Sequence, residues 1–107
     1  MPHYLMQVAY TPEAWKTMSK NPQSRIDAVR PAVEGLGGKI ETGYLCFGDY
    51  DLVVIGEFPK NTDAAAFAMA CCAGGAVKEF KTTPLLTAQE GVEAMKGSSR
   101  SAYEPPG

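Results

Sequence analysis

The sequence predicts an α+β domain built on an antiparallel sheet with helices on one face. Three observations indicate this class: the chain is short, β-rich runs alternate with helical patterns, and Gly, Pro and capping residues separate the two kinds of segment. Its 107 residues, 45% hydrophobic and 21% charged, are typical of one globular domain. Such a small domain buries only about 60–70% of its unfolded surface, so we expect self-association to bury more.

The first strand and the first helices are expected in the N-terminal third of the chain. Residues 4–10 are rich in aromatic and aliphatic side chains, which favours a strand. The Thr-Pro-Glu sequence at 11–13 is typical of a helix N-terminus. Asn21 followed by Pro22 repeats this signal, so we expect the helix to break and restart there. Apolar residues at 26, 29, 33 and 36 then recur at helical spacing, and two glycines end the helix.

The second half of the chain is predicted to add three strands and an Ala-rich helix. Residues 39–47 and 52–58 are β-rich runs separated by a Gly-Asp-Tyr-Asp turn. The helix is expected to start near 61 and to end at a pair of glycines after residue 73. Residues 77–83 alternate and carry charges on both faces, which indicates an edge strand.

The resulting order, strand–helix–strand–strand–helix–strand, is the ferredoxin-like pattern. Thr87 and Glu90 form a capping-box sequence, which predicts one more helix after the fourth strand. We therefore expect a single domain over residues 1–96. The Ser-, Pro- and Gly-containing segment 97–107 is expected to be a flexible tail.

The hairpin between residues 39 and 58 has two faces of different character. If Phe47 pairs with Leu52 across a four-residue turn, one face is the more apolar and is expected to meet the helices. It carries Glu41, Leu45, Phe47, Leu52, Val54 and Phe58. The opposite face carries Tyr44, Val53, Ile55 and Glu57, and no segment of the chain is left to cover it. Exposed apolar patches of this kind mark partner or ligand surfaces. We therefore expect at least a dimer whose sheets pack face to face, with a cavity between them.

The stretch Phe-Gly-Asp-Tyr-Asp-Leu-Val-Val-Ile-Gly-Glu-Phe-Pro at 47–59 resembles the defining segment of the GYD-domain family, which is named after Gly48, Asp49 and Tyr50. Similar segments lie at 36–39, 64–67 and 74–77, and the resemblance covers about residues 4–90. It implies a ferredoxin-like fold of the dimeric α/β-barrel type, and it implies no particular reaction or catalytic residue. A more distant similarity is to effector-binding domains of amino-acid-responsive regulators, which share the turn.

Five residues are candidates for ligand binding, and no catalytic residue can be assigned. They are Gln7, Tyr44, Tyr50, Asp51 and Glu57. The residues of the 48–51 turn are interpreted first as turn formers, because Gly and Asp favour such backbone conformations. The alternative is that Tyr50 or Asp51 contacts a ligand at the mouth of the cavity. Glu57 is either an ion-pair partner of Lys39 or Lys81, or a carboxylate enclosed by the dimer with a raised pKa.

No metal site and no cofactor are predicted. The chain has one histidine, His3, and lacks the Cys-x-x-Cys and His-x-x-x-His spacings of metal sites. Its three cysteines do not form a disulfide framework, which favours a reducing cytoplasm. Arg25 is interpreted as a solvated or capping residue, with binding of an anionic group as the alternative.

Charge and hydropathy exclude several function classes. The net charge is −2 and no basic stripe is present, so we expect neither nucleic acid nor an acidic membrane surface as a partner. No signal peptide or membrane span is recognisable. The leading hypothesis is small-molecule binding or sensing by a homo-oligomer. The alternatives are a structural or adaptor protein and a cofactor-independent enzyme, such as a monooxygenase or isomerase.

Overall fold

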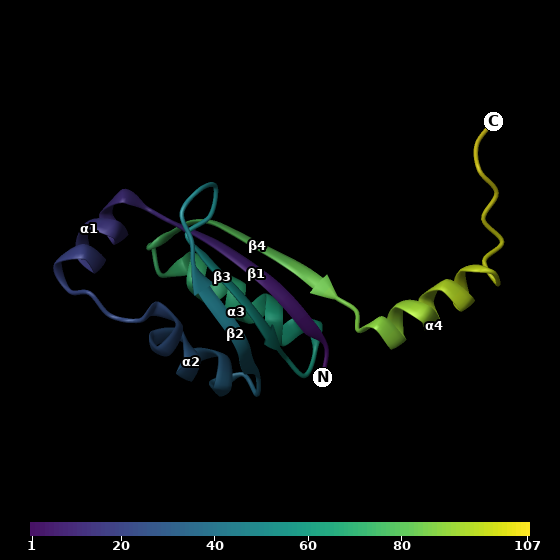
Figure 1. Ribbon diagram of the computed structural model, residues 1–107, viewed down its shortest axis with the longest axis horizontal. Helices are drawn as coiled ribbons and strands as arrows, with labels where there is room; N and C mark the ends of the chain where they lie inside the picture. Colours follow the sequence, from purple (N-terminus) through teal and green to yellow (C-terminus); the bar gives the residue numbers. More distant parts are fainter.

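The computed structural model describes residues 1–107 and contains one four-stranded sheet with four helices (Figure 1). The elements in chain order are β1 (His3–Tyr10), α1 (Pro12–Lys20), α2 (Arg25–Gly35), β2 (Lys39–Leu45), β3 (Leu52–Glu57), α3 (Asn61–Ala73), β4 (Val77–Leu85) and α4 (Ala88–Ser98). The strands lie in the order β2-β3-β1-β4, with every neighbouring pair antiparallel. The predicted ferredoxin-like α+β fold is therefore confirmed, with β4 at an edge. No helix combines the length and the apolar character needed to cross a membrane.

The helix starts follow the capping chemistry of the sequence, with one correction. The Thr11 hydroxyl accepts a hydrogen bond from the Ala14 amide, 3.1 Å away, and α1 begins at the proline after it. The second helix starts later than predicted, because Ser24 rather than Asn21 is its N-cap. The Ser24 hydroxyl accepts from the amide of Asp27, whereas Asn21 ends α1.

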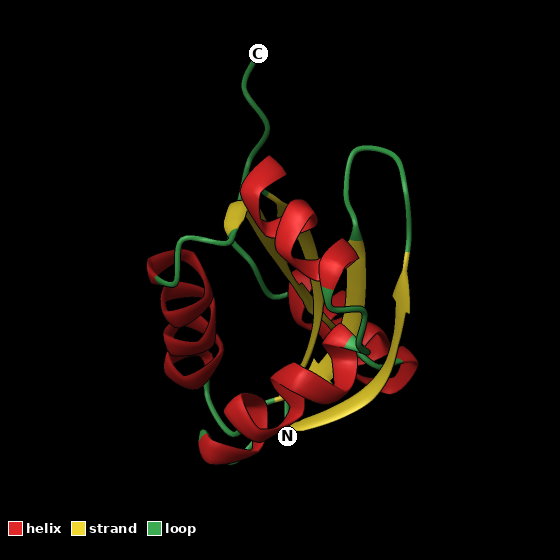
Figure 2. Cartoon of the chain, turned by 90° about the vertical axis from the view of Figure 1, so that its left-hand side faces the viewer, coloured by secondary structure: helices red, strands yellow, loops and turns green.

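The predicted pairing of Phe47 with Leu52 is wrong by two residues. Leu52 pairs with Leu45, and residues 46–51 form the longer loop that projects beyond the sheet in Figure 2. Backbone hydrogen bonds fix this register, because the Asp51 amide donates to the Val8 carbonyl and the Asp51 carbonyl accepts from the Cys46 amide. Phe47 is 99% exposed at the loop tip. A shift of two residues keeps the side chains of β3, and those of β2 from Thr42 onward, on their predicted faces.

The two faces of the sheet are unequal. Side chains that point to the helices are almost fully buried, among them Tyr4, Met6, Val8, Leu52 and Val54. α2 packs against β2 and α3 packs against β4, so the core lies between these helices and the sheet. Leu5, Val53 and Ile55 alternate with those residues and lie on the opposite face, where Tyr44 is 70% exposed. No helix of the chain packs on this second face, which we call the open face.

Glu41 departs from its predicted place on the helix side. The register of β2 against β3 shifts between Ile40 and Thr42, which leaves Glu41 as the extra residue of a β-bulge. Bulges bend the strand and redirect side chains. Here the Glu41 carboxylate reaches the open face, where it contacts the imidazole of His3.

The last helix stands apart from the rest of the fold. Figure 1 shows α4 beyond the end of β4, with the C-terminus farther away. None of its residues is buried, and Val92 and Met95 are exposed. The radius of gyration is 16.9 Å, whereas a compact chain of this length has about 13 Å. The capping box nevertheless forms as predicted, with both hydrogen bonds between Thr87 and Glu90 present.

Candidate functional site

Asp51 holds the β2–β3 loop against the start of the helical layer. One oxygen of its carboxylate accepts hydrogen bonds from the Tyr10 amide at 2.9 Å and from the indole N–H of Trp15 at 3.3 Å. Tyr10 is the last residue of β1 and Trp15 lies in α1, so one side chain joins three segments. Asp51 therefore stabilises the fold at this turn, and a carboxylate directly after Gly-Asp-Tyr is the group that accepts both hydrogen bonds.

Tyr50 lies near Glu79 of the edge strand β4. Partial burial and the nearby carboxylates of Glu79 and Asp49 raise the pKa of its phenol above the usual range. The phenol therefore stays protonated at neutral pH. It can donate a hydrogen bond, but it cannot act as a general base there.

The other three candidates share the open face. Gln7 of β1 and Tyr44 of β2 both lie opposite Val53 in the register, on either side of β3. Glu57 lies at the end of β3, opposite His3. The sheet therefore places Gln7 and Tyr44 on either side of Val53, near the start of β3, and Glu57 at the other end of that strand, with Ile55 between them.

A cluster at that end was not foreseen from the sequence. His3 Nδ1 lies 2.6 Å from a carboxylate oxygen of Glu41, and His3 Nε2 lies 3.9 Å from one of Glu57. One ligand atom from each residue lies within 4.8 Å of the others. Glu57 makes no ion pair with Lys39 or Lys81, so the prediction of that ion pair is wrong. The group that faces its carboxylate is the imidazole of His3.

This cluster can move a proton between imidazole and carboxylate, and its donor set also suits a divalent cation. A sequence signal existed for His3, because it alternates with Leu5 and Gln7 on β1 and so shares their face. No signal existed for Glu41, since a bulge inside a β-rich run leaves no mark in the periodicity.

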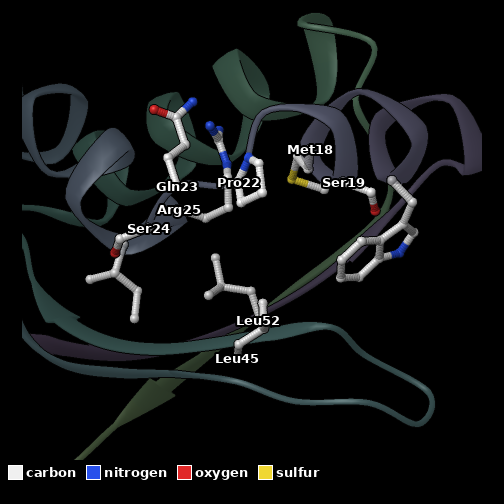
Figure 3. Close-up of a pocket in the computed structure, with 10 residues that line it drawn as sticks. Met18, Ser19, Pro22, Gln23, Ser24, Arg25, Leu45 and Leu52 are labelled. Carbon is white, nitrogen blue, oxygen red and sulfur yellow. The ribbon is translucent and has the colours of Figure 1, made fainter.

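A second concave region lies on the helix side of the sheet. A cavity of about 300 Å³ opens between α2 and α3, and thirteen of its fifteen lining residues are hydrophobic. Arg25, the first residue of α2, lines this cavity and also the adjoining hollow of about 260 Å³ shown in Figure 3. The Figure 3 hollow has Leu45 and Leu52 on its strand side and Met18 and Pro22 on the other.

Arg25 is half-buried and its Nε atom is buried with no hydrogen-bond partner. None of the ion pairs of the protein involves its guanidinium. The interpretation of Arg25 as a solvated or capping residue therefore does not describe its Nε atom, which water does not reach. Its positive charge acts on the pKa of Tyr10 and of Cys71, so it lies near the ends of β1 and α3 that line the same cavity.

Comparison with known proteins agrees with the fold and the turn motif. Residues 4–95 match the family model described as the GYD domain. The chain belongs to the GYD-domain family. Among solved structures, the chain is similar to the protein TTHA0845 from Thermus thermophilus, with a TM-score of 0.53, 16% identity, and coverage of 82% of this chain and 96% of that one. No curated protein matches the sequence.

A hypothetical protein, PHS023 from Pyrococcus horikoshii, is similar to the same extent, with a TM-score of 0.51, 16% identity, and coverage of 81% of this chain and 92% of that one. At these identities the likeness concerns the fold alone. The loop that carries the GYD motif is fixed by Asp51, which directly follows the Gly-Asp-Tyr sequence.

Proposed function

We propose that this GYD-domain protein is a homo-oligomer that binds a small molecule in a cavity between the open faces of two copies. The observation that carries the proposal is the open face itself. It has an apolar centre, a polar rim and no cover from any helix of its own chain. Sheets that pack face to face lie about 10 Å apart, which encloses side chains from both faces.

The small core supports the need for a second copy. Only 13 of the 107 residues are buried, and Tyr44, Leu45 and Met95 are large apolar residues among the exposed ones. An 11-residue helix that buries none of its residues, such as α4, is marginally stable in water. Packing against a neighbouring copy would stabilise both features.

The rim indicates the chemistry of the ligand. Leu5, Val53 and Ile55 offer an apolar surface, and Gln7 can donate and accept hydrogen bonds. At the end of the face the carboxylates of Glu41 and Glu57 favour a hydrogen-bond donor or a cationic group. The ligand we expect has an apolar body and one such polar end. The free cysteines fit a reducing compartment such as the cytoplasm.

One observation favours a second function, a cofactor-independent enzyme. His3 and Glu41 are in hydrogen-bonding contact, and Glu57 lies on the other side of the same imidazole. This arrangement can take up a proton from a substrate held on the open face. If a substrate is found, Glu41→Gln and Glu57→Gln should lower turnover more than they lower substrate affinity.

Oligomeric state tests the main proposal, with two matched variants. Tyr44 on the open face and Met69 on α3 are both 70% exposed, but they lie on opposite sides of the sheet. We expect light scattering to show that Tyr44→Asp dissociates the oligomer and that Met69→Asp leaves it intact. Native mass spectrometry of protein purified from cells should show a bound small molecule in the oligomer and none in Tyr44→Asp.

A monomeric wild-type protein at micromolar concentration would contradict the proposal. Dissociation by Met69→Asp, with Tyr44→Asp still oligomeric, would place the interface on the helix side. An intact oligomer that never carries a ligand would favour the structural or adaptor alternative.

A further inference from the structure

We propose that the cavity between α2 and α3 binds a small amphipathic monocarboxylic acid, with its carboxylate held by Arg25 and Tyr10 and its apolar body lying over the central strands. This site lies on the helix side of the sheet within one chain. It is therefore separate from the cavity proposed between open faces, and it does not depend on the oligomer.

The cavity exists because the two helices cover the outer strands of the sheet. α2 packs on β2 and α3 packs on β4. These strands are three spacings apart, or about 14 Å, whereas helices in contact lie about 8–10 Å apart. The central strands β3 and β1 are thus left between the helices as an apolar floor.

Large side chains fill only one end of the space between the helices. There the rings of Tyr4 and Phe67 both pack on Phe58, with centroid distances of 5.9 and 5.8 Å. At the other end the residues from α3 and the loop after it are small: Ala70, Cys71, Gly74 and Ala76. The cavity of about 300 Å³ lies at this second end.

The guanidinium group of Arg25 has no ion-pair partner and lies at the border between the apolar cavity and the hollow of Figure 3. Its Nε is buried without a hydrogen-bond partner, and no carboxylate of the chain forms an ion pair with it. Charged groups that are shielded from water are normally paired, because shielding costs free energy in lost hydration, and this cost applies here to the buried Nε. An anionic ligand would supply the missing partner, and a guanidinium can hold a carboxylate through two parallel hydrogen bonds.

Tyr10 supplies a second donor at the same place. Its side chain is buried, and it lies close enough to Arg25 for the positive charge to act on the phenol. Burial raises the pKa of the Tyr10 phenol above its usual range, although Arg25 opposes this shift. The phenol is therefore protonated at neutral pH and can donate to one carboxylate oxygen while Arg25 holds the other.

The volume of the cavity limits the size of the acid. At about 30 Å³ for each water-sized atom, about 300 Å³ holds about ten non-hydrogen atoms. This volume is at the lower end of the range for small-molecule sites. Octanoate and 3-phenylpropanoate are of this size, and they offer an aliphatic and an aromatic body for the same carboxylate.

Nuclear magnetic resonance titration of the full chain tests the proposal. We expect at least one of the two acids to bind saturably, with shift changes at Val29 and Cys71 on the cavity walls. The uncharged analogue 1-octanol should bind at least about tenfold more weakly than octanoate, because it lacks a charge for Arg25. Arg25→Gln should lower the affinity by a similar factor. The matched control is Arg30→Gln on the same helix, because Arg30 already pairs with Asp27; this variant should bind normally.

Two more variants distinguish binding in this cavity from binding on the open face and from a loss of folding. Tyr10→Phe keeps the buried ring but removes one hydrogen-bond donor, so it should weaken acid binding by less than Arg25→Gln does. If Arg25→Gln does not fold, the affinity of Tyr10→Phe still tests whether the acid binds in this cavity. Tyr44→Asp, which targets the open face, should bind the acid as the wild type does.

Four results would overturn the proposal. They are failure of both acids to saturate, equal binding of 1-octanol, equal binding by Arg25→Gln and Arg30→Gln, and shift changes centred on Tyr44 and Ile55. Acid binding that appears only in Met95→Asp would also contradict it. That result would mean that α4 of a second copy fills the cavity.

Discussion

Replacing Asp51 by alanine tests whether the acid of the GYD loop is a structural group. The change removes the acceptor of two hydrogen bonds and leaves the Tyr10 amide and the Trp15 indole N–H without their partner. A hydrogen bond to a charged group contributes about 1.5–3 kcal/mol, and the bond from Trp15, at 3.3 Å, is the weaker of the two. Because water can reach this half-buried site, we expect a net loss of about 2–3 kcal/mol.

Urea denaturation followed by circular dichroism and Trp15 fluorescence measures this loss. A decrease of about 2–3 kcal/mol corresponds to a fall of about 10 °C or more in the melting temperature of a domain this small. The control is Asp49→Ala, because Asp49 is exposed in the same loop and its side chain makes no hydrogen bond. A loss below about 0.5 kcal/mol for Asp51→Ala, or equal losses for both variants, would refute the structural role of Asp51.

Three other predictions concern different parts of the fold. Gly38→Ala should destabilise the protein by about 1–3 kcal/mol, because an added Cβ would lie 2.6 Å from a backbone carbonyl oxygen of β3. Gly35→Ala, with open space at that position, should stabilise α2 by about 0.5–1 kcal/mol. Equal effects of the two substitutions in urea titrations would contradict this. Iodoacetamide at pH 8 should modify the exposed Cys72 much faster than Cys71. Burial raises the pKa of Cys71 to about 11, so about one Cys71 thiol in a thousand is ionised at this pH. Equal modification rates in peptide mapping would be inconsistent with this burial. Hydrogen bonds from the capping residue Thr87 lower the pKa of Glu90 below 4.5. The contribution of the capping box to the stability of α4 should therefore be complete above pH 4.5 and disappear as the pH falls through the lowered pKa. An NMR pH titration in which the amide signals of α4 do not change in that range would contradict this prediction.

Local chemistry in the sequence was enough to predict the element order. Thr11 and the Thr87–Glu90 pair act as the caps that their positions indicated, because capping depends on neighbours within one helical turn. The faces of β3 followed from the alternation of apolar residues. Even with the wrong register, Tyr44 and Val53 were placed correctly on the same face, since a shift of two residues preserves the face.

The features that sequence reasoning missed depend on contacts between distant segments. The hairpin register is set by β1, through the Val8 carbonyl that accepts from Asp51. The bulge that turns Glu41 toward His3 is a departure from regular pairing, and neither residue carries a local mark of it. The unpaired state of Arg25 depends on which carboxylates fail to reach it, which only the folded chain shows.

The proposed oligomer requires that a second copy of the chain covers the open face. Isotope-filtered NMR on an equal mixture of labelled and unlabelled protein tests this arrangement, because it detects contacts only between different copies. We expect intermolecular contacts from the methyl groups of Val53 and Ile55, in a particle of twice the chain mass of 11.4 kDa or more. Contacts confined to Met69 and other residues of α3, or no intermolecular contacts at all, would contradict it.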